Sequence, residues 1–158
     1  MIPPRRMRPA ALSSAALVLL AAGCLSGGSA TSTSRPQLTR AQYITAAGTV
    51  CRRYQQRIAA LGASSDLAEL ADQGAKAVAL ERAEVKALRR LAPPDSDAAA
   101  IDRMLKAVEA ATVAGDALVA AARSHDAAAV TEAAARLRSR LAAANRLAKP
   151  YGLDVCAR

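Results

Sequence analysis

The chain has 158 residues, a formal net charge of +9 and a hydrophobic content of 53%. It contains no Phe or Trp and only three Tyr, so each buried side chain removes little apolar surface from water and the core is thin. Alanine dominates the apolar residues and is the strongest helix former, whereas the β-branched runs that support a sheet are nearly missing. The composition therefore excludes a large sheet and predicts an all-α protein.

Residues 1–23 have the layout of a bacterial lipoprotein signal peptide. An arginine-rich start precedes an apolar stretch over residues 10–22, which is short for a membrane span. This stretch ends in Leu-Ala-Ala-Gly before Cys24. The pattern resembles the lipobox, in which the cysteine is acylated, for instance with palmitate, and becomes the mature N-terminus, although Ala21 stands where Leu is usual. Two alternatives stay open: an unlipidated secreted protein, and twin-arginine export through Arg5 and Arg6.

Residues 24–38 are rich in Ser, Thr and Gly and offer little to a core. Such a segment behaves as a flexible tether with a reach of roughly 20 Å. A lipid on Cys24 and this tether are expected to hold the remaining residues, 39–158, at the extracytoplasmic face of the cell membrane. Those residues have the size of one domain.

The first helix is expected to begin after Thr39, because Thr39 and Gln42 have the spacing of a capping box. Gly62 is expected to end it. Its apolar residues recur at steps of three and four, as on one buried face of a helix: Tyr43, Ala47, Cys51, Tyr54, Ile58 and Leu61.

The second helix is expected to start at Asp66, with Glu69 as its capping partner, and to end near Leu91, because Pro93 and Pro94 forbid its continuation. Its apolar face comprises Leu67, Leu70, Gly74, Ala77, Val78, Val85 and Leu88. A cap within residues 95–97 starts the third helix. Its apolar face comprises Ile101, Met104, Leu105, Val108, Ala111, Gly115, Val119 and Ala122.

A short turn at residues 124–126 precedes the fourth helix. The apolar face of that helix comprises Val130, Ala133, Ala134, Leu137, Leu141, Ala144 and Ala148. Because short connections make neighbouring helices antiparallel, the sequence predicts an up-down-up-down four-helix bundle. Gly74 and Gly115 are expected to let helix axes approach closely.

The cysteine count supports one disulfide bond. With Cys24 assigned to lipid, Cys51 and Cys156 remain as a pair in an oxidising compartment. Cys51 lies roughly 18 Å along the first helix. The tail that follows a turn at Pro150-Tyr151-Gly152 spans at most roughly 20 Å, which is just enough to reach Cys51. We therefore predict a Cys51–Cys156 disulfide that staples the bundle.

Two short motifs bracket the predicted domain: YITAAGTVC at residues 43–51 and YGLDVC at residues 151–156. They resemble the bracketing motifs of small, uncharacterised actinobacterial envelope lipoproteins. The resemblance implies an alanine-rich helical bundle with this disulfide, and it implies no activity.

No enzyme motif is recognisable, neither a nucleophile elbow nor a glycine-rich phosphate loop, so we expect a non-enzymatic protein without a metal or another cofactor. The single histidine, His125, is expected in a solvated turn, where neither zinc nor haem ligation is expected of it. Glu81 and Thr112 lie on the apolar faces of the second and third helices. They are candidates for a small polar pocket inside the bundle; the alternative is that Glu81 pairs with an arginine or lies at the rim.

Two arginine runs are candidates for a basic patch, on the first helix (Arg52, Arg53 and Arg57) and on the fourth (Arg136, Arg138 and Arg140). Without the three arginines of the signal peptide, the formal charge is 19 − 13 = +6. This charge favours anionic lipid, a wall polymer or an envelope protein as partner, unless the arginines only solvate helix faces. Nucleic acid is not expected, because of the export signal and because no aromatic residues are interleaved for base stacking.

The sequence thus favours a lipid-anchored structural or interaction module at the bacterial cell envelope. The alternative is a small-ligand-binding or metal-binding lipoprotein that uses a polar pocket in the bundle interior.

Overall fold

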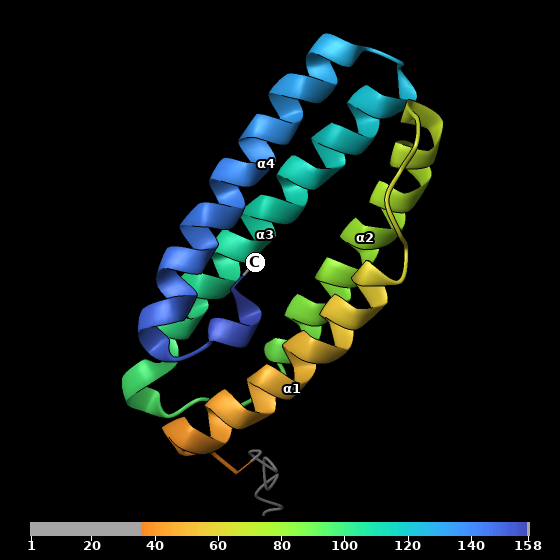
Figure 1. Cartoon of the computed structure of the whole chain (residues 1–158). Coiled ribbons are helices and arrows are strands. Elements are labelled where there is room, and N and C mark those ends of the chain that lie inside the picture. Colours follow the sequence, from red (N-terminus) through yellow and green to blue (C-terminus); the bar gives the residue numbers. More distant parts are fainter. Residues whose placement is uncertain (1–35, 158) are drawn as a thin grey trace, which may run out of the picture. The chain divides into compact units, whose positions relative to one another are not determined.

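The computed structural model describes residues 36–157, which form a helical domain (Figure 1). Its helices are α1 (Arg40–Ala59), α2 (Leu67–Leu88), α3 (Asp95–Arg123) and α4 (Ala127–Ala148), followed by the short 3-10 helices η1 (Lys149–Tyr151) and η2 (Asp154–Cys156). The predicted signal peptide, Cys24 and most of the predicted tether lie outside the described residues. Within the described part, no helix is both long and apolar enough to cross a membrane.

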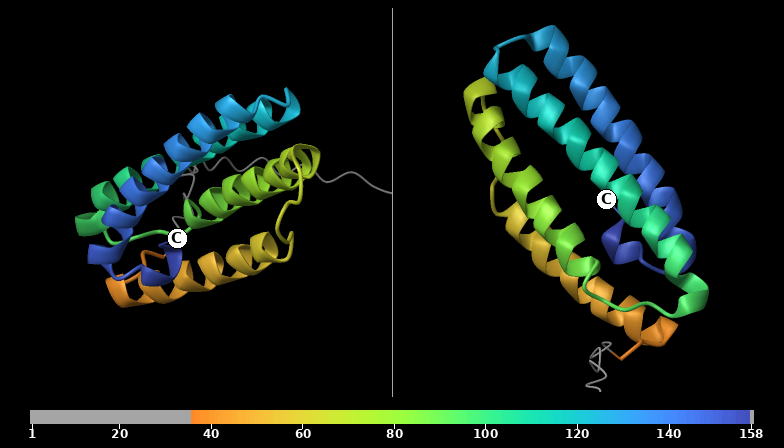
Figure 2. Two further views of the ribbon diagram at one scale, coloured as in Figure 1. Left: turned by 45° about the horizontal axis from the view of Figure 1, so that its top comes forward. Right: turned by 180° about the vertical axis from the view of Figure 1, so that it is seen from behind.

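The four α-helices pack in chain order, each antiparallel to the next (Figures 1 and 2). α1 packs on α2, α2 on α3 and α3 on α4, whereas α1 and α4 are not among the closely packed pairs. The C-terminal segment, defined as residues 149–157, continues from α4 and packs on α1 through η2. The expected up-down-up-down bundle is therefore confirmed, with the C-terminal segment between its first and last helices.

Side-chain caps begin α1 and α2 as expected. Thr39 Oγ1 accepts a hydrogen bond from the Gln42 N–H at 3.3 Å, and Gln42 Oε1 accepts one from the Thr39 N–H at 2.9 Å. Asp66 accepts a hydrogen bond from the Glu69 N–H at 2.8 Å. The Glu69 carboxylate reaches one residue further back than a capping box requires and accepts from the Ser65 N–H at 2.7 Å.

The start of α3 and the end of α2 differ from the expectation. Pro94, and not an aspartate, occupies the N-cap position of α3 and provides no side-chain cap. Asp95 and Asp97 lie in the first turn instead, where a negative charge interacts favourably with the helix dipole. α2 ends at Leu88 because the chain already turns over residues 89–91, ahead of the two prolines that require an extended approach.

The main core lies where the C-terminal segment meets α1. Its buried residues are Tyr43, Ala47, Cys51, Leu88, Ile101, Met104, Leu105, Ala148, Tyr151 and Leu153. Tyr43, Leu153 and Cys51 are the largest side chains that are almost completely inaccessible to solvent. The C-terminal segment therefore supplies two of the ten buried residues of this core, Tyr151 and Leu153, and the four α-helices supply the others.

Two glycines permit the close approach of α2 and α3. A Cβ atom built on Gly115 would lie 2.8 Å from Val78 Cγ2, and one built on Gly74 would lie 3.0 Å from Val119 Cγ2. Both distances are too short for carbon atoms in ordinary contact. The expected close helix packing at Gly74 and Gly115 is therefore confirmed.

Substituting Gly115→Ala is expected to lower the free energy of unfolding by about 1–2 kcal/mol, because overpacking against Val78 outweighs the gain in helix propensity. Gly48→Ala is the matched control, since its added Cβ would meet only Arg52 Nη1, at 3.6 Å, and it is expected to gain about 0.5–1 kcal/mol. Urea unfolding followed by circular dichroism measures both. Changes of the same sign in the two variants would contradict the close approach.

Candidate functional site

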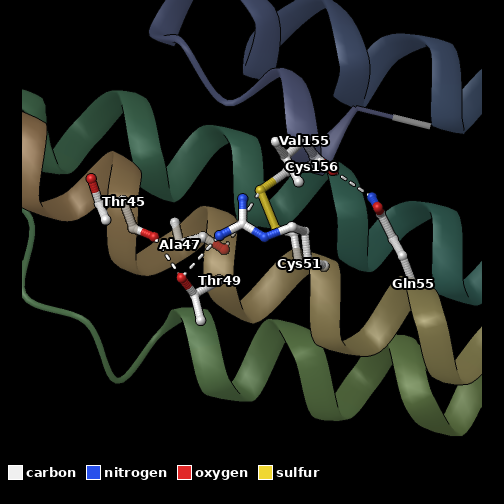
Figure 3. The surroundings of a disulfide bond; sticks show 8 residues. Thr45, Ala47, Thr49, Cys51, Gln55, Val155 and Cys156 are labelled. Atoms are coloured by element: carbon white, nitrogen blue, oxygen red, sulfur yellow. Dashed lines mark hydrogen bonds between the residues drawn. A yellow bond between two sulfur atoms is a disulfide. The ribbon is translucent and has the colours of Figure 1, made fainter.

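The C-terminal segment is bonded covalently to α1. Cys51 and Cys156 form a disulfide across 105 residues of sequence, with their Cα atoms 5.2 Å apart (Figure 3). Gly152 makes the turn with a φ of +90°, a left-handed conformation that glycine adopts without strain. Gln55 donates a hydrogen bond from its side chain to the carbonyl of Val155 beside the bond (Figure 3). The predicted pairing is confirmed.

Tyr151 anchors the same segment to the starts of α1 and α3. Its hydroxyl donates a hydrogen bond to Asp97 Oδ2 at 2.8 Å, and its ring packs edge-on against Tyr43 with centroids 6.1 Å apart. The guanidinium of Arg40 lies 4.4 Å from the centroid of the Tyr151 ring. Burial, helped by the bond to Asp97, raises the pKa of Tyr151 to about 12. These contacts fix the segment at a second point, besides the disulfide.

The deeply buried carboxylate of α2 is Glu84, which is only 4% exposed, whereas Glu81 is half-buried. Glu84 and Asn145 line an interior cavity of about 30 Å³, together with Leu88, Met104, Val108, Leu141, Ala144, Ala148 and Cys156. This volume corresponds to about one water molecule. The sequence missed Glu84 because α3, α4 and Cys156 all cover this flank of α2, which the periodicity of a single helix does not reveal.

Glu81 and Thr112, the predicted polar pair, line different cavities. Glu81 lies with Gly74, Gly115 and Leu137 around a cavity of about 150 Å³, whereas Thr112 lines one of about 200 Å³. The Thr112 hydroxyl donates a hydrogen bond at 2.8 Å to the carbonyl of Glu109, on its own helix. Neither of these two cavities brings the pair together.

The two predicted arginine runs lie on helices that are not closely packed against each other. Their members are all exposed: Arg52, Arg53, Arg57, Arg136, Arg138 and Arg140. Arg53 and Arg57 lie over the ring of Tyr54, at 5.1 and 5.6 Å from its centroid, and Arg136 pairs with Glu132. The runs therefore belong to separate helix surfaces, each with local partners.

His125 is exposed in the turn between α3 and α4, as expected, and has a left-handed φ of +54°. Residues 36–157 contain no cluster of three or more His, Cys, Asp or Glu side chains that could hold a metal ion.

The largest of the described hollows is an open groove of about 570 Å³ between the end of α1 and the middle of α2. We call it the basic groove and define it by its lining: Arg57, Ala60, Leu61, Lys76, Ala79, Leu80 and Ala83. Two cationic side chains thus flank an aliphatic floor, and no acidic residue lines it. The sequence contained a signal for it, since Lys76, Ala79, Leu80 and Ala83 have helical spacing on a second face of α2, apart from the core face.

Replacing both disulfide cysteines (Cys51→Ala with Cys156→Ala) is expected to lower the free energy of unfolding by about 2–5 kcal/mol, because the unfolded chain regains the freedom that the bond removes. Chemical denaturation of the oxidised protein, the reduced protein and the double variant measures the loss. The reduced wild type is expected to match the double variant. Equal stability of the oxidised and reduced proteins would contradict a stabilising role for the bond.

Tyr43 is expected to make the fold sensitive to alkali. Burial raises the pKa of Tyr43 to about 12, above the usual value of about 10. The contribution of the protonated Tyr43 to the free energy of unfolding is therefore complete below pH 10 and is lost as the pH rises through 12. Between pH 10 and pH 12, the free energy of unfolding of Tyr43→Phe is expected to fall by roughly 3 kcal/mol less than that of the wild type. Its stability at pH 8 should not fall, since the Tyr43 hydroxyl has no hydrogen-bond partner among the described residues. Parallel alkaline unfolding curves of the wild type and the variant would refute this role.

Comparison with known proteins finds no protein-family model, no curated protein and no solved structure that matches the chain.

Proposed function

We propose that this protein is a lipid-anchored, non-enzymatic structural or interaction module at the bacterial cell envelope. The observation that carries the proposal is the Cys51–Cys156 disulfide. Structural disulfides form and persist in oxidising compartments outside the cytosol, which supports export. The bond also uses two of the three cysteines of the chain, which leaves Cys24, in the lipobox-like segment, available for acylation.

The basic groove supports a role in interaction. It lies on the outside of the domain and has a volume of about 570 Å³, whereas the interior cavity beside Glu84 has about 30 Å³. A contact that uses the outer surface leaves the packed interior and its disulfide undisturbed. The exposed arginines of α1 and α4 add positive surface, which favours anionic lipid, wall polymer or an acidic envelope protein as partner.

A second candidate function is the binding of a small ligand or metal ion inside the bundle. Glu84, which is buried, and Asn145, which is half-buried, line one interior cavity and favour it. The cavity limits such a ligand to about the size of one water molecule. The groove offers far more room, so we prefer the interaction module.

Intact mass spectrometry of the exported protein, purified from membranes in detergent, tests the proposed anchor. We expect a chain that begins at Cys24 and carries the added mass of acyl chains. The variant Cys24→Ser is expected to lack this mass. The double variant Cys51→Ser with Cys156→Ser is the control, because it should keep the lipid while losing the disulfide. An exported wild type with an unmodified N-terminus would refute the lipid anchor.

A further inference from the structure

Building on the proposed role as an interaction module, we infer that the basic groove binds an amphipathic α-helix of a partner protein, whose apolar stripe is flanked by carboxylates.

The spacing of the groove residues is that of a helix-packing surface. On α2, the lining positions 76, 79, 80 and 83 follow the i, i+3, i+4, i+7 pattern, and they face Arg57 on the last turn of α1 together with Ala60 and Leu61, which form its C-cap and the turn that follows. Residues with this spacing share one face of a helix. An exposed helix face of this kind, bordered on one side by the end of a neighbouring helix, forms a groove into which a further helix can pack.

The side chains on the floor suit a helix as occupant. Ala60 and Ala79 are exposed, and Ala83 is half-buried; such small side chains let a third helix approach to about 8–10 Å between axes. Leu61 and Leu80, both half-buried, provide larger apolar contacts. A small-molecule site encloses most of its ligand, whereas this groove is open. An amphipathic helix covers such a floor and presents its own polar face to solvent.

The two cations at the rim of the basic groove, Arg57 and Lys76, favour an acidic partner. Arg57 and Lys76 are exposed, and neither forms a salt bridge with another described residue. Arg57 is held over the ring of Tyr54, which orients its guanidinium. Carboxylates on both flanks of an incoming helix would meet these two cations. Such rim pairs act mainly on orientation and association rate.

The basic groove lies away from the end of the domain that the predicted tether enters. The predicted tether enters the domain at the start of α1, and Arg57 lies 17 residues beyond Arg40, the first residue of that helix. At 1.5 Å per residue, this places the rim about 26 Å from the attached end. The groove is therefore well separated from the point of attachment.

The test uses the mature chain, residues 24–158, carrying Cys24→Ser and with its disulfide formed. The probe is a synthetic helical peptide of about three heptads, with Leu and Ala on one face and Glu on both flanks. A second peptide carries Lys in place of Glu, and a third carries a central proline that breaks the helix. Fluorescence anisotropy at about 50 and 300 mM salt measures affinity, and methyl NMR shifts of Leu61, Leu80 and Ala79 report the location.

We expect the acidic peptide to bind at least about tenfold more tightly than the Lys peptide and the proline peptide, to weaken at high salt, and to shift the three methyl-bearing residues. Lys76→Glu and Ala79→Gln should each weaken binding at least about fivefold, through charge repulsion and through blockage of the floor. Lys86→Glu and Ala68→Gln, at exposed positions of α2 outside the groove, are the matched controls and should leave affinity within about twofold.

Equal binding of the acidic and Lys peptides, equal losses in the Lys86→Glu and Lys76→Glu variants, or NMR shifts elsewhere on the domain would overturn the inference. Dimerisation that Ala79→Gln abolishes would assign the groove to a second copy of the chain instead. Binding to anionic vesicles that depends on Lys76 would assign it to lipid. The lipid on Cys24 is measured in a separate experiment. A failed peptide experiment therefore refutes helix binding by the basic groove and does not affect the proposed lipid anchor. An unmodified Cys24 refutes the lipid anchor and does not affect helix binding.

Discussion

The Cys51–Cys156 bond holds the end of the chain on α1, and the largest fully buried side chains meet at this junction. Because the chain has no Phe or Trp, it cannot bury much apolar area at each position, so stabilisation depends on where its few larger residues gather. Tyr43 and Leu153 gather there only when the C-terminal segment is folded back. The folded-back arrangement of the C-terminal segment is therefore needed for three features: the disulfide bond, the Tyr151–Asp97 hydrogen bond and the core.

A different kind of packing joins α2 and α3. Gly74 and Gly115 remove the side chains that would keep these helices apart, and close contact takes the place of bulky apolar burial. α1 contributes its buried residues from Tyr43 to Tyr54 and ends at Ala59. Its last turn and the facing turns of α2 are therefore left with an uncovered aliphatic surface. The basic groove forms because the buried residues of α1 stop at Tyr54, before the helix ends.

Local signals in the sequence predicted most of the fold. The Thr39 cap, the helix faces, the glycine contact and the disulfide could be read because each depends on spacing along the chain or on the pairing of two cysteines. The burial of Glu84 could not, since it depends on which flank of α2 is covered by α4 and by Cys156. The groove was missed for the same reason: the spacing of Lys76 and Leu80 indicates a helix face, but only the packed helices decide whether that face is covered.

Charge alone would not have located the candidate surface. Several exposed cations of the domain pair with nearby acids, such as Arg82 with Asp116 and Arg136 with Glu132, and exposed pairs of this kind contribute little to stability. What distinguishes Arg57 and Lys76 is the aliphatic floor between them, contributed by α2 and by the turn that follows α1. A cation that is fully exposed to solvent attracts many anions weakly and does not discriminate among them. A pair of cations that borders an apolar stripe instead selects a partner that must present both an apolar face and negative flanks, which makes shape and charge together the basis of specificity.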